Sequence, residues 1–250
     1  DASGNVYVGH RNDHRVRKIA PDGTVSTLAG SGDRGSADGP AASAQFRSPD
    51  GVAVDASGNV YVMDSCRLRK ITPDGNVTTV AGTGACDNPV DGVGQAAGFS
   101  YGYRIALDGS GNVYVADADF GVRKVAPNGT VTTLPMTPNV SENYLSDVAV
   151  DASGNVYVAT ENDRRLHRIG ADGAVVHFAG VGEYGNADGP RSSARIGSRL
   201  SGIDFDSRGY VVVADRNNGT IRQVSTAPGT LPALRVAPPP PSPRRPAQRA

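Results

Sequence analysis

An eight-residue phrase that occurs five times constrains the fold of this chain more than any other feature. Its first copy, Asp1–Val8, reads Asp-Ala-Ser-Gly-Asn-Val-Tyr-Val, and further copies begin at residues 55, 108, 151 and 206, the last of them decayed. Such a long, regular spacing in a strand-rich sequence indicates a repeat protein, in which each unit is a supersecondary module that packs on its neighbours.

One repeat unit predicts four short strands, here called a, b, c and d. In the unit after Pro49 these strands are expected at Gly51–Asp55, Val60–Val62, Arg67–Ile71 and Val77–Val80. Ser57–Asn59 and Pro73–Gly75 hold residues that tolerate positive φ, so both predict tight hairpin turns. Four antiparallel strands followed by a long connection are typical of a β-propeller blade.

We therefore predict an all-β fold, a β-propeller of four-stranded antiparallel blades with five blades visible. The first blade lacks its innermost strand, because the sequence opens at the turn between strands a and b, and the fifth keeps a strand d at Thr230–Val236. We expect these blades to be part of a six-bladed ring, with an imperfectly closed five-bladed ring as the alternative. The propeller domain is predicted to span residues 1–236. Residues 237–250 are rich in proline and arginine and predict a disordered tail.

Composition narrows the class of partner. The chain has 25 basic and 25 acidic residues and a net charge of zero, so it carries no overall field that favours nucleic acid. No apolar run approaches the length of about 18 residues that spans a bilayer, so we expect no membrane span. The partner, whether a protein, a glycan or a small molecule, is not indicated.

Sequence variation is confined to one face of the predicted ring. The a–b and c–d turns are nearly identical from blade to blade, whereas the b–c hairpins and the long d–a linkers differ. Variation on one face of a repeat array is where ligand contacts usually lie. We predict that this variable face binds the ligand through eight residues: His10, His14, Asp64, Asp117, Asp119, Glu161, Asp215 and Asn217.

Carboxylates recur where strand b ends. Asp64, Asp117 and Asp215 occupy equivalent positions. The fourth blade has Thr160 at this position, and Glu161 is the next residue. Side chains at one height near the axis could hold a hard cation such as Ca²⁺, which prefers oxygen ligands and could act as a Lewis acid. The alternative is that each Asp accepts hydrogen bonds from the backbone of its own blade.

The whole pattern resembles the NHL-repeat family of propellers. The similarity rests on Gly-Val-Ala-Val-Asp at Gly51–Asp55, on Gly-Asn-Val-Tyr-Val in the repeated phrase and on Pro-Asp-Gly-x-Val at the c–d turns, and it covers residues 1–236. The linker sequence of Ala29–Pro40, echoed at Ala179–Pro190, adds to it. The resemblance implies bacterial, exported members. The family contains protein- and RNA-binding modules, and related six-bladed propellers include metal-dependent lactonases and lyases, so membership alone does not decide the function.

Three further motifs have a structural explanation. The glycine-rich runs Gly30–Gly35 and Gly180–Gly185 match a dinucleotide-binding fingerprint, but no helix start follows them, so we interpret them as linkers. Asp55–Asn59 is similar to the opening of a calcium loop, and we interpret it as a turn. The basic pairs of strand c, such as Arg69-Lys70 and Arg123-Lys124, are interpreted as solvated blade flanks.

The histidines and cysteines are few. By register, His167 falls in strand c and His177 in strand d of the fourth blade, and no complete zinc site or catalytic triad can be assembled from sequence. Cys66 and Cys86 both lie on the variable face of the second blade, where a disulfide would fix the d–a linker. Two free thiols in a reducing compartment are the alternative. The disulfide and the family resemblance favour an extracellular or periplasmic location.

These observations leave two classes of function. The first is a non-enzymatic binding or scaffolding propeller that uses the variable face. The alternative is a divalent-metal-dependent hydrolase or lyase, similar to a lactonase, with its site at the channel mouth formed by Asp64, Asp117, Glu161 and Asp215. A structural module within a longer repeat protein is a third interpretation.

Overall fold

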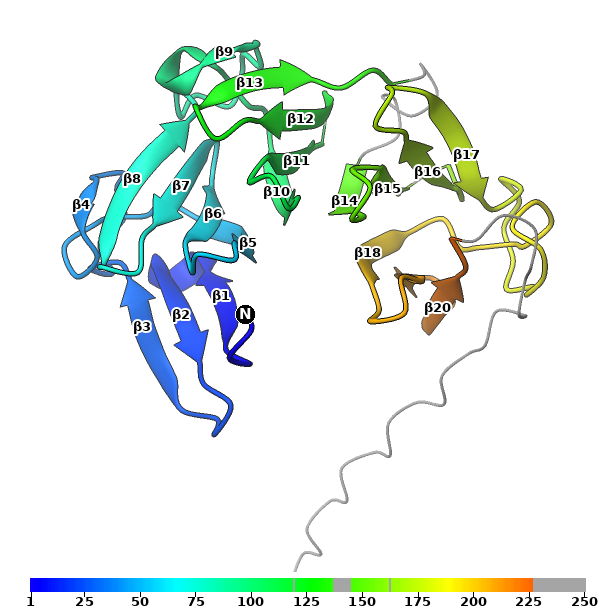
Figure 1. Ribbon diagram of the computed structural model, residues 1–250, viewed down its shortest axis with the longest axis horizontal. Helices are drawn as coiled ribbons and strands as arrows, with labels where there is room; N and C mark the ends of the chain where they lie inside the picture. The colour runs from blue at the N-terminus through cyan, green and yellow to red at the C-terminus, as the bar shows by residue number, and fades with distance from the viewer. Residues whose placement is uncertain (119, 137–144, 162, 227–250) are drawn as a thin grey trace, which may run out of the picture.

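The computed structural model describes residues 1–118, 120–136, 145–161 and 163–226. These residues form five small antiparallel sheets arranged around a central axis, so the prediction of an all-β propeller with five blades is confirmed (Figure 1). The predicted strand Thr230–Val236, the tail at 237–250 and the binding-face residue Asp119 lie outside the described residues. A sixth blade stays a prediction.

Each blade is a meander of consecutive strands. Blade one contains β1 (Val6–His10), β2 (Arg15–Ile19) and β3 (Val25–Ala29). Blade two contains β5 (Pro49–Val54), β6 (Val60–Asp64), β7 (Arg67–Ile71) and β8 (Asn76–Ala81). Blade three contains β10 (Gly102–Leu107), β11 (Val113–Asp117), β12 (Gly121–Val125) and β13 (Thr130–Thr133). Blade four contains β14 (Leu145–Val150), β15 (Val156–Thr160), β16 (Leu166–Ile169) and β17 (Val175–Ala179). Blade five contains β18 (Leu200–Phe205), β19 (Val211–Asp215) and β20 (Thr220–Val224).

Neighbouring blades pack side by side around the axis. The innermost strand of each blade contacts that of the next, β5 against β10, β10 against β14 and β14 against β18. Apolar side chains fill the space between blades; Tyr61, Met63 and Phe99 pack with Val115 between blades two and three. In Figure 1 the blades form an open arc, in which blades one and five face each other across a gap. The strand-a residues therefore line the axis.

The repeated phrase is a turn held by its own aspartate. Asp55 Oδ1 accepts hydrogen bonds from the backbone N–H groups of Ser57 and Asn59, both at 2.9 Å, and Asn59 Nδ2 donates to Oδ2 at 2.8 Å. The copies at Asp108 and Asp151 repeat this arrangement. The interpretation as a turn is confirmed, because the donors of the turn occupy the carboxylate oxygens that a calcium loop would use.

The long linkers do more than connect blades. The linker before blade two contributes β4 (Gly39–Pro40), which pairs with the outer strand β8, and the linker before blade three contributes β9 (Gly92–Val93), which pairs with β13. Short 3₁₀ turns occur at Arg11–Asp13 and Gly94–Ala96. Each of these linkers therefore wraps around the outer edge of the blade that it precedes.

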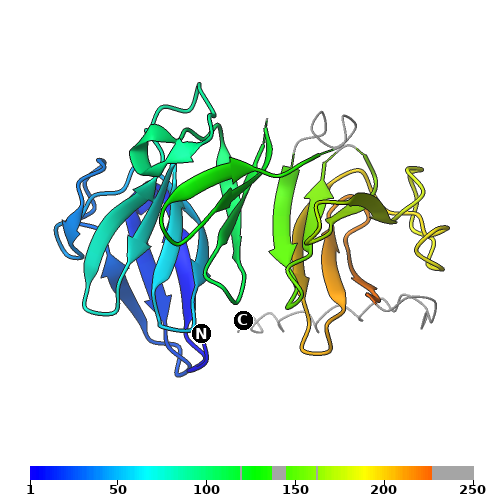
Figure 2. The ribbon, with the colours of Figure 1, turned by 45° about the horizontal axis from the view of Figure 1, so that its top comes forward.

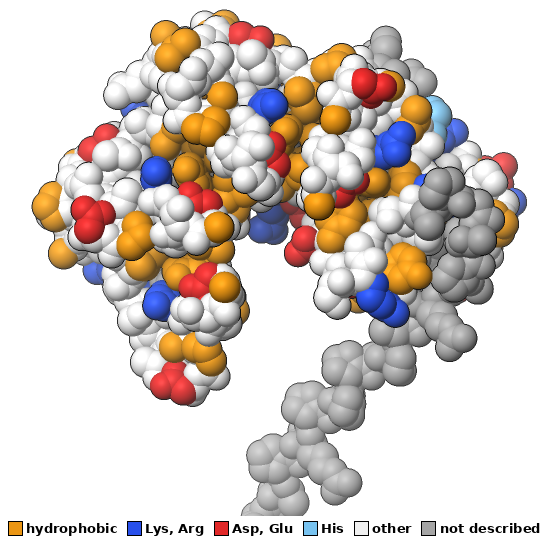
Figure 3. Space-filling view, in the orientation of Figure 1, with side chains coloured by type: hydrophobic (Ala, Val, Ile, Leu, Met, Phe, Trp, Pro, Cys, Tyr) orange, Lys and Arg blue, Asp and Glu red, His pale blue; other side chains and the backbone are white. Residues whose placement is uncertain are grey.

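The two faces of the arc are different, as the topology requires. In Figure 2 the a–b turns of blades one and five lie along the lower rim, and the linker between blades two and three rises at the upper rim. Figure 3 shows basic and acidic side chains interspersed over the face in view, which agrees with the zero net charge. No helix among the described residues is long and apolar enough to cross a membrane.

Candidate functional site

The aspartates predicted at the ends of strand b are buried within their own blades. Asp64 Oδ1 accepts hydrogen bonds from the backbone N–H groups of Arg47 at 2.8 Å and Ser48 at 2.6 Å. Asp117 accepts from the Ser100 N–H at 3.0 Å, and Asp215 accepts from the Gly197 N–H at 2.9 Å. In each case the donor belongs to the end of the linker that leads into the same blade.

The same aspartates face a buried arginine from strand c. The distances from guanidinium nitrogen to carboxylate oxygen are 3.3 Å for Arg69–Asp64, 3.7 Å for Arg123–Asp117 and 3.5 Å for Arg222–Asp215. The three arginines have exposed fractions of only 0–1%. The prediction that the basic pairs of strand c are solvated is therefore wrong for Arg69 and Arg123, which face inward because side chains alternate along a strand.

Each of these buried arginines also binds a second carboxylate, which belongs to the preceding linker. Asp38 binds Arg69 at 2.7 Å, Asp91 binds Arg123 at 2.9 Å and Asp188 binds Arg222 at 2.6 Å. These three aspartates were not identified from sequence, although the recurring Asp-Gly dipeptide of the linkers was a usable signal. Each arginine thus lies between an inner and a linker aspartate. This arrangement satisfies a buried charge and holds the linker against its blade.

Burial dominates the electrostatics of Asp64. Desolvation raises the pKa of Asp64, although the hydrogen bonds from Ser48 and Arg47 and the charge of Arg69 act in the opposite direction. Among the described residues, the four carboxylates predicted to share a cation, Asp64, Asp117, Glu161 and Asp215, are not brought together into one cluster. The structure instead gives the three aspartates a local role in each blade.

The variable face has a cavity at its centre, to which all five blades contribute. We call this cavity, which has a volume of about 380 Å³, the mouth. It is lined by Arg11, Asp50, Arg104, Ala118, Leu145, Ser146, Glu161 and Ser201. A second cavity of about 390 Å³ lies along the inner strands β5, β10, β14 and β18, and Arg104 lines both. Of the described residues that were predicted to bind ligand, Glu161 is the one that lines the mouth.

Arg104 and Asp147 give the axis its charge. Arg104 on β10 pairs with Ala116, and Asp147 on β14 pairs with Ala159, so the two residues are equivalent in register. At the same position blade five has Gly202, which pairs with Ala214. Asp147 Oδ2 accepts a hydrogen bond from the Ile203 N–H of blade five at 3.0 Å. Desolvation raises the pKa of Asp147, and the nearby Arg104 partly offsets this effect. A charged residue where the repeat has glycine was the sequence signal for this site.

Three of the other predicted binding residues, His10, His14 and Asn217, contact neighbouring groups. His10 Nδ1 is 3.4 Å from an Asp13 carboxylate oxygen, and the His14 ring forms a hydrogen bond with the Arg47 carbonyl at 2.9 Å. Asn217 Nδ2 donates to Ser198 Oγ at 2.7 Å. Arg11 reaches the mouth from the same hairpin as His10 and lies 3.4 Å from Asp50.

Cys66 and Cys86 form a disulfide, with their Cα atoms 5.4 Å apart. The bond joins the b–c hairpin of blade two to the linker before blade three. Cys86 also lines a small cavity of about 110 Å³ with Arg11, Asp50 and Tyr101. The disulfide therefore fixes the linker directly beside the mouth.

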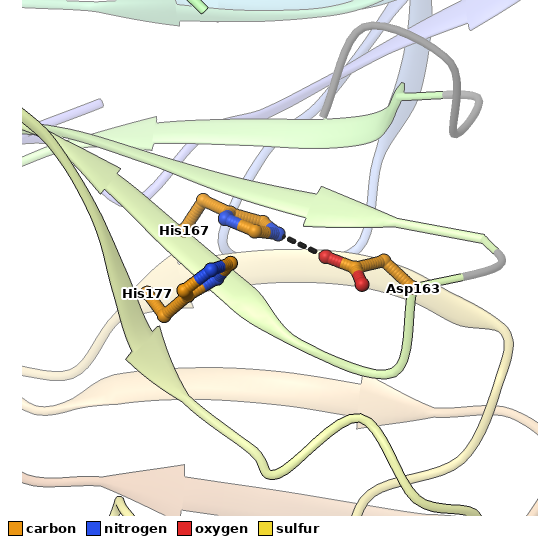
Figure 4. A group of neighbouring side chains, drawn as sticks. All are labelled: Asp163, His167 and His177. Carbon is orange, nitrogen blue, oxygen red and sulfur yellow. Dashed lines mark hydrogen bonds and ion pairs between the residues drawn. The ribbon is translucent and has the colours of Figure 1, made fainter. Parts of the chain in front are cut away.

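Blade four holds a separate cluster of possible metal ligands. Asp163, His167 and His177 each offer a ligand atom, and these atoms lie within 4.8 Å of one another. In Figure 4 the His167 ring points to the Asp163 carboxylate, and the His177 ring lies beside both on the neighbouring strand. Asp163 was not singled out from sequence, because it lies in a hairpin and only the fold brings it next to the two strands.

Comparisons with known proteins agree with the blade pattern. The family profile of the teneurin NHL domain matches residues 30–90. Among solved structures, a virginiamycin B lyase from Staphylococcus aureus is similar, with 14% identity and a TM-score of 0.64, covering 96% of this chain and 69% of that one. A streptogramin B lyase has 12% identity and a TM-score of 0.54, covering 95% of this chain and 77% of that one.

An auxiliary nutrient binding protein from Bacteroides ovatus is similar over 93% of this chain and 53% of its own, with 12% identity and a TM-score of 0.62. At such low identity these structures show a shared fold. Together with the repeated blades they show a β-propeller, and the family profile shows that residues 30–90 are similar to an NHL domain.

Proposed function

We propose that this protein is a non-enzymatic binding propeller whose ligand enters the mouth of the axis on the variable face. The observation that carries the proposal is the cavity of about 380 Å³ lined by residues of every blade. Its volume falls within the range of about 300–1,000 Å³ typical of small-molecule sites. The resemblance in fold to a nutrient binding protein is compatible with this class of function.

The chemistry of the mouth favours a polar ligand of mixed charge. Arg104 and Arg11 can bind a carboxylate or another anion, whereas Asp50 and Glu161 accept hydrogen bonds from an amine or hydroxyl groups. Short peptides and acidic sugars combine both kinds of group. The disulfide beside the mouth supports our proposal of an extracellular or periplasmic location, where such ligands would be met.

The test is a screen of dipeptides, tripeptides and uronic acids by thermal shift, with hits measured by calorimetry. We expect Arg104→Ala to weaken binding of a hit by about tenfold or more, because it removes a charge-assisted hydrogen bond. The control is Arg34→Ala, an exposed arginine of a linker. A hit that binds the Arg104→Ala variant with unchanged affinity would place the ligand elsewhere on the protein.

A hydrolase or lyase is the second candidate, because the carboxylates of Asp50 and Glu161 line the same cavity. Two carboxylates beside one cavity could hold a divalent cation or move a proton. The assay uses lactones, esters and quinupristin, the compound in one of the similar lyase structures, with Mg²⁺, Mn²⁺ or Ca²⁺ present. Turnover that is lost in Glu161→Gln would favour this candidate, and binding without turnover would favour the first.

A further inference from the structure

Blade four differs from its neighbours at one cross-strand pair. The strand-c position that faces inward is paired with a strand-d residue, and these pairs are Arg17 with Thr27, Arg69 with Thr79, Arg123 with Thr133 and, in blade four, His167 with His177. Both partners are thus histidine in blade four only, among the blades whose strands c and d are both described. Two imidazoles that replace an arginine and a threonine on facing positions indicate a different chemistry.

The inner aspartate of blades two, three and five is absent from blade four, as it is from blade one, where His10 ends strand b. Its position on β15 holds Thr160, which is buried, and Thr160 Oγ1 has no hydrogen-bond partner among the described residues. In blades two, three and five the inner aspartate faces the permanent guanidinium charge of a strand-c arginine, which lies between carboxylates. In blade four the imidazole of His167 takes the place of this guanidinium group.

Asp163 brings a carboxylate back to this site from the b–c hairpin. Its Oδ2 atom bonds His167 Nε2, and its Oδ1 atom bonds Arg165 at 2.7 Å. The rings of His167 and His177 lie with their centroids 4.9 Å apart, as Figure 4 shows. His167 is 1% exposed, and its Nδ1 atom has no partner among the described residues.

We propose that Asp163, His167 and His177 bind one divalent transition-metal ion, with Zn²⁺ as the reference ion. Two imidazoles and one carboxylate form a donor set that suits Zn²⁺, Co²⁺, Ni²⁺ or Cu²⁺. The ion supplies the positive charge that arginine supplies in the other blades. It takes the place of the proton shared by His167 and Asp163.

The surroundings of the cluster decide the form of the site. His177 is exposed and lines a cavity of about 790 Å³, through which an ion and a fourth ligand reach the cluster. Arg165, Arg168 and Arg191 line the same cavity and oppose a cation, so we expect micromolar affinity and an anion or water as the fourth ligand.

The repeats supply the variants that test the site. His167→Arg reproduces blade one, where Arg17 binds Asp13, and His177→Thr reproduces the strand-d residue of blades one to three. Both changes are compatible with the blade fold. His10→Ala is the matched control, because His10 is an exposed histidine of another blade.

The experiment is calorimetry of the chelator-treated full chain with Zn²⁺, together with visible absorption after Co²⁺ is added. We expect one ion per chain and a tetrahedral Co²⁺ spectrum. Each site variant should weaken binding by about 100-fold or more, since even changes around the ligands cost about 10–100-fold. The His10→Ala variant should bind as the wild type does.

Two outcomes would overturn the proposal. The first is the absence of a stoichiometric site in the wild type. The second is binding that stays unchanged in His167→Arg and His177→Thr. Circular dichroism and thermal unfolding of each variant verify that a loss of binding is not a loss of fold.

Discussion

The carboxylate of Asp38, in a linker, binds the guanidinium of Arg69, in the middle of the next blade, at 2.7 Å. Asp38 also accepts hydrogen bonds from the backbone N–H and the side-chain hydroxyl of Thr79 on the outer strand, at 2.9 and 3.0 Å. One aspartate therefore joins the linker, strand c and strand d. Asp91 does the same for Arg123 and Thr133 in blade three.

We expect Asp38→Ala to lower the free energy of unfolding by about 2 kcal/mol, because a buried arginine loses one of its two carboxylates and charged hydrogen bonds are worth about 1.5–3 kcal/mol. Urea denaturation measures the loss. The matched control is Asp74→Ala, an exposed aspartate of a c–d turn, which should change stability by less than about 0.5 kcal/mol. Equal losses in the two variants would show that the pair with Arg69 contributes no stability.

The disulfide should stabilise the protein as well as position its linker. It closes a loop with a sequence separation of 20 residues, for which the chain-entropy estimate is about 3 kcal/mol. We expect dithiothreitol to lower the urea midpoint of the wild type. The double variant Cys66→Ala/Cys86→Ala should have the lower midpoint from the start and should not respond to the reductant. An unchanged wild-type midpoint after verified reduction would contradict the prediction.

The sequence was sufficient for the blades but not for the pairing of buried charges. Strand order and turns follow from local patterns, namely period-two alternation and Asp-anchored turns, and both repeat along the chain. The partners of Arg69 are Asp64 and Asp38, which lie 5 and 31 residues away along the chain. No local pattern reports which strand-c side chain faces inward toward such distant carboxylates, so the arginines were wrongly placed in solvent.

For the mouth, the sequence predicted a variable face of the ring and the residues Asp64, Asp117, Glu161 and Asp215. Of these residues, Glu161 lines the cavity on that face, and the use of the face for ligand binding stays a prediction. Loop variation does not indicate Arg104, which lines the mouth, or Asp147, which lines the second cavity, because both lie within inner strands. Their signal is a charge at a position that is glycine in other blades. Departures from a repeat are therefore as informative as the repeat itself.

Asp147 should make stability depend on pH in a direction opposite to that of a salt-bridged aspartate. Its pKa in the folded protein is raised, mainly by desolvation, with Arg104 lowering it and Asp204 raising it. The folded state then binds the proton more tightly than the unfolded state does, so stability falls as pH rises from the unfolded pKa through the folded one. We expect the wild type to gain stability relative to Asp147→Asn as pH is lowered from 7 to about 4.

Urea denaturation of both proteins at a series of pH values measures this difference, and all other titrating groups cancel in the comparison. A difference that stays constant with pH would mean that Asp147 has the same pKa in the folded and unfolded states. A difference that grows with rising pH would mean that the hydrogen bonds from Ile203 and Val148, together with Arg104, outweigh desolvation.

The linker glycines that are similar to a nucleotide-binding fingerprint have a steric role. Gly30, Gly82 and Gly180 are equivalent, and all have positive φ, at +110°, +105° and +93°. In each case a Cβ atom would lie 2.3–2.6 Å from a backbone carbonyl oxygen of the b–c hairpin in the same blade. The linker can therefore leave strand d and pass this hairpin only where it has no side chain.

Gly82→Ala should consequently cost more than an ordinary substitution at positive φ. The new Cβ would lie 2.3 Å from the Cys66 carbonyl oxygen and 3.0 Å from the Arg67 Cα atom, and backbone atoms cannot rotate away. Gly209→Ala is the control, because Gly209 has φ of +78° but no heavy atom within 4 Å of the added Cβ. We expect about 1 kcal/mol of destabilisation for Gly209→Ala from backbone strain alone and about 3 kcal/mol or more for Gly82→Ala, where a steric clash adds to that strain. Urea denaturation compares the two variants, and equal losses would mean that conformation, rather than the close approach of hairpin and linker, requires glycine at position 82.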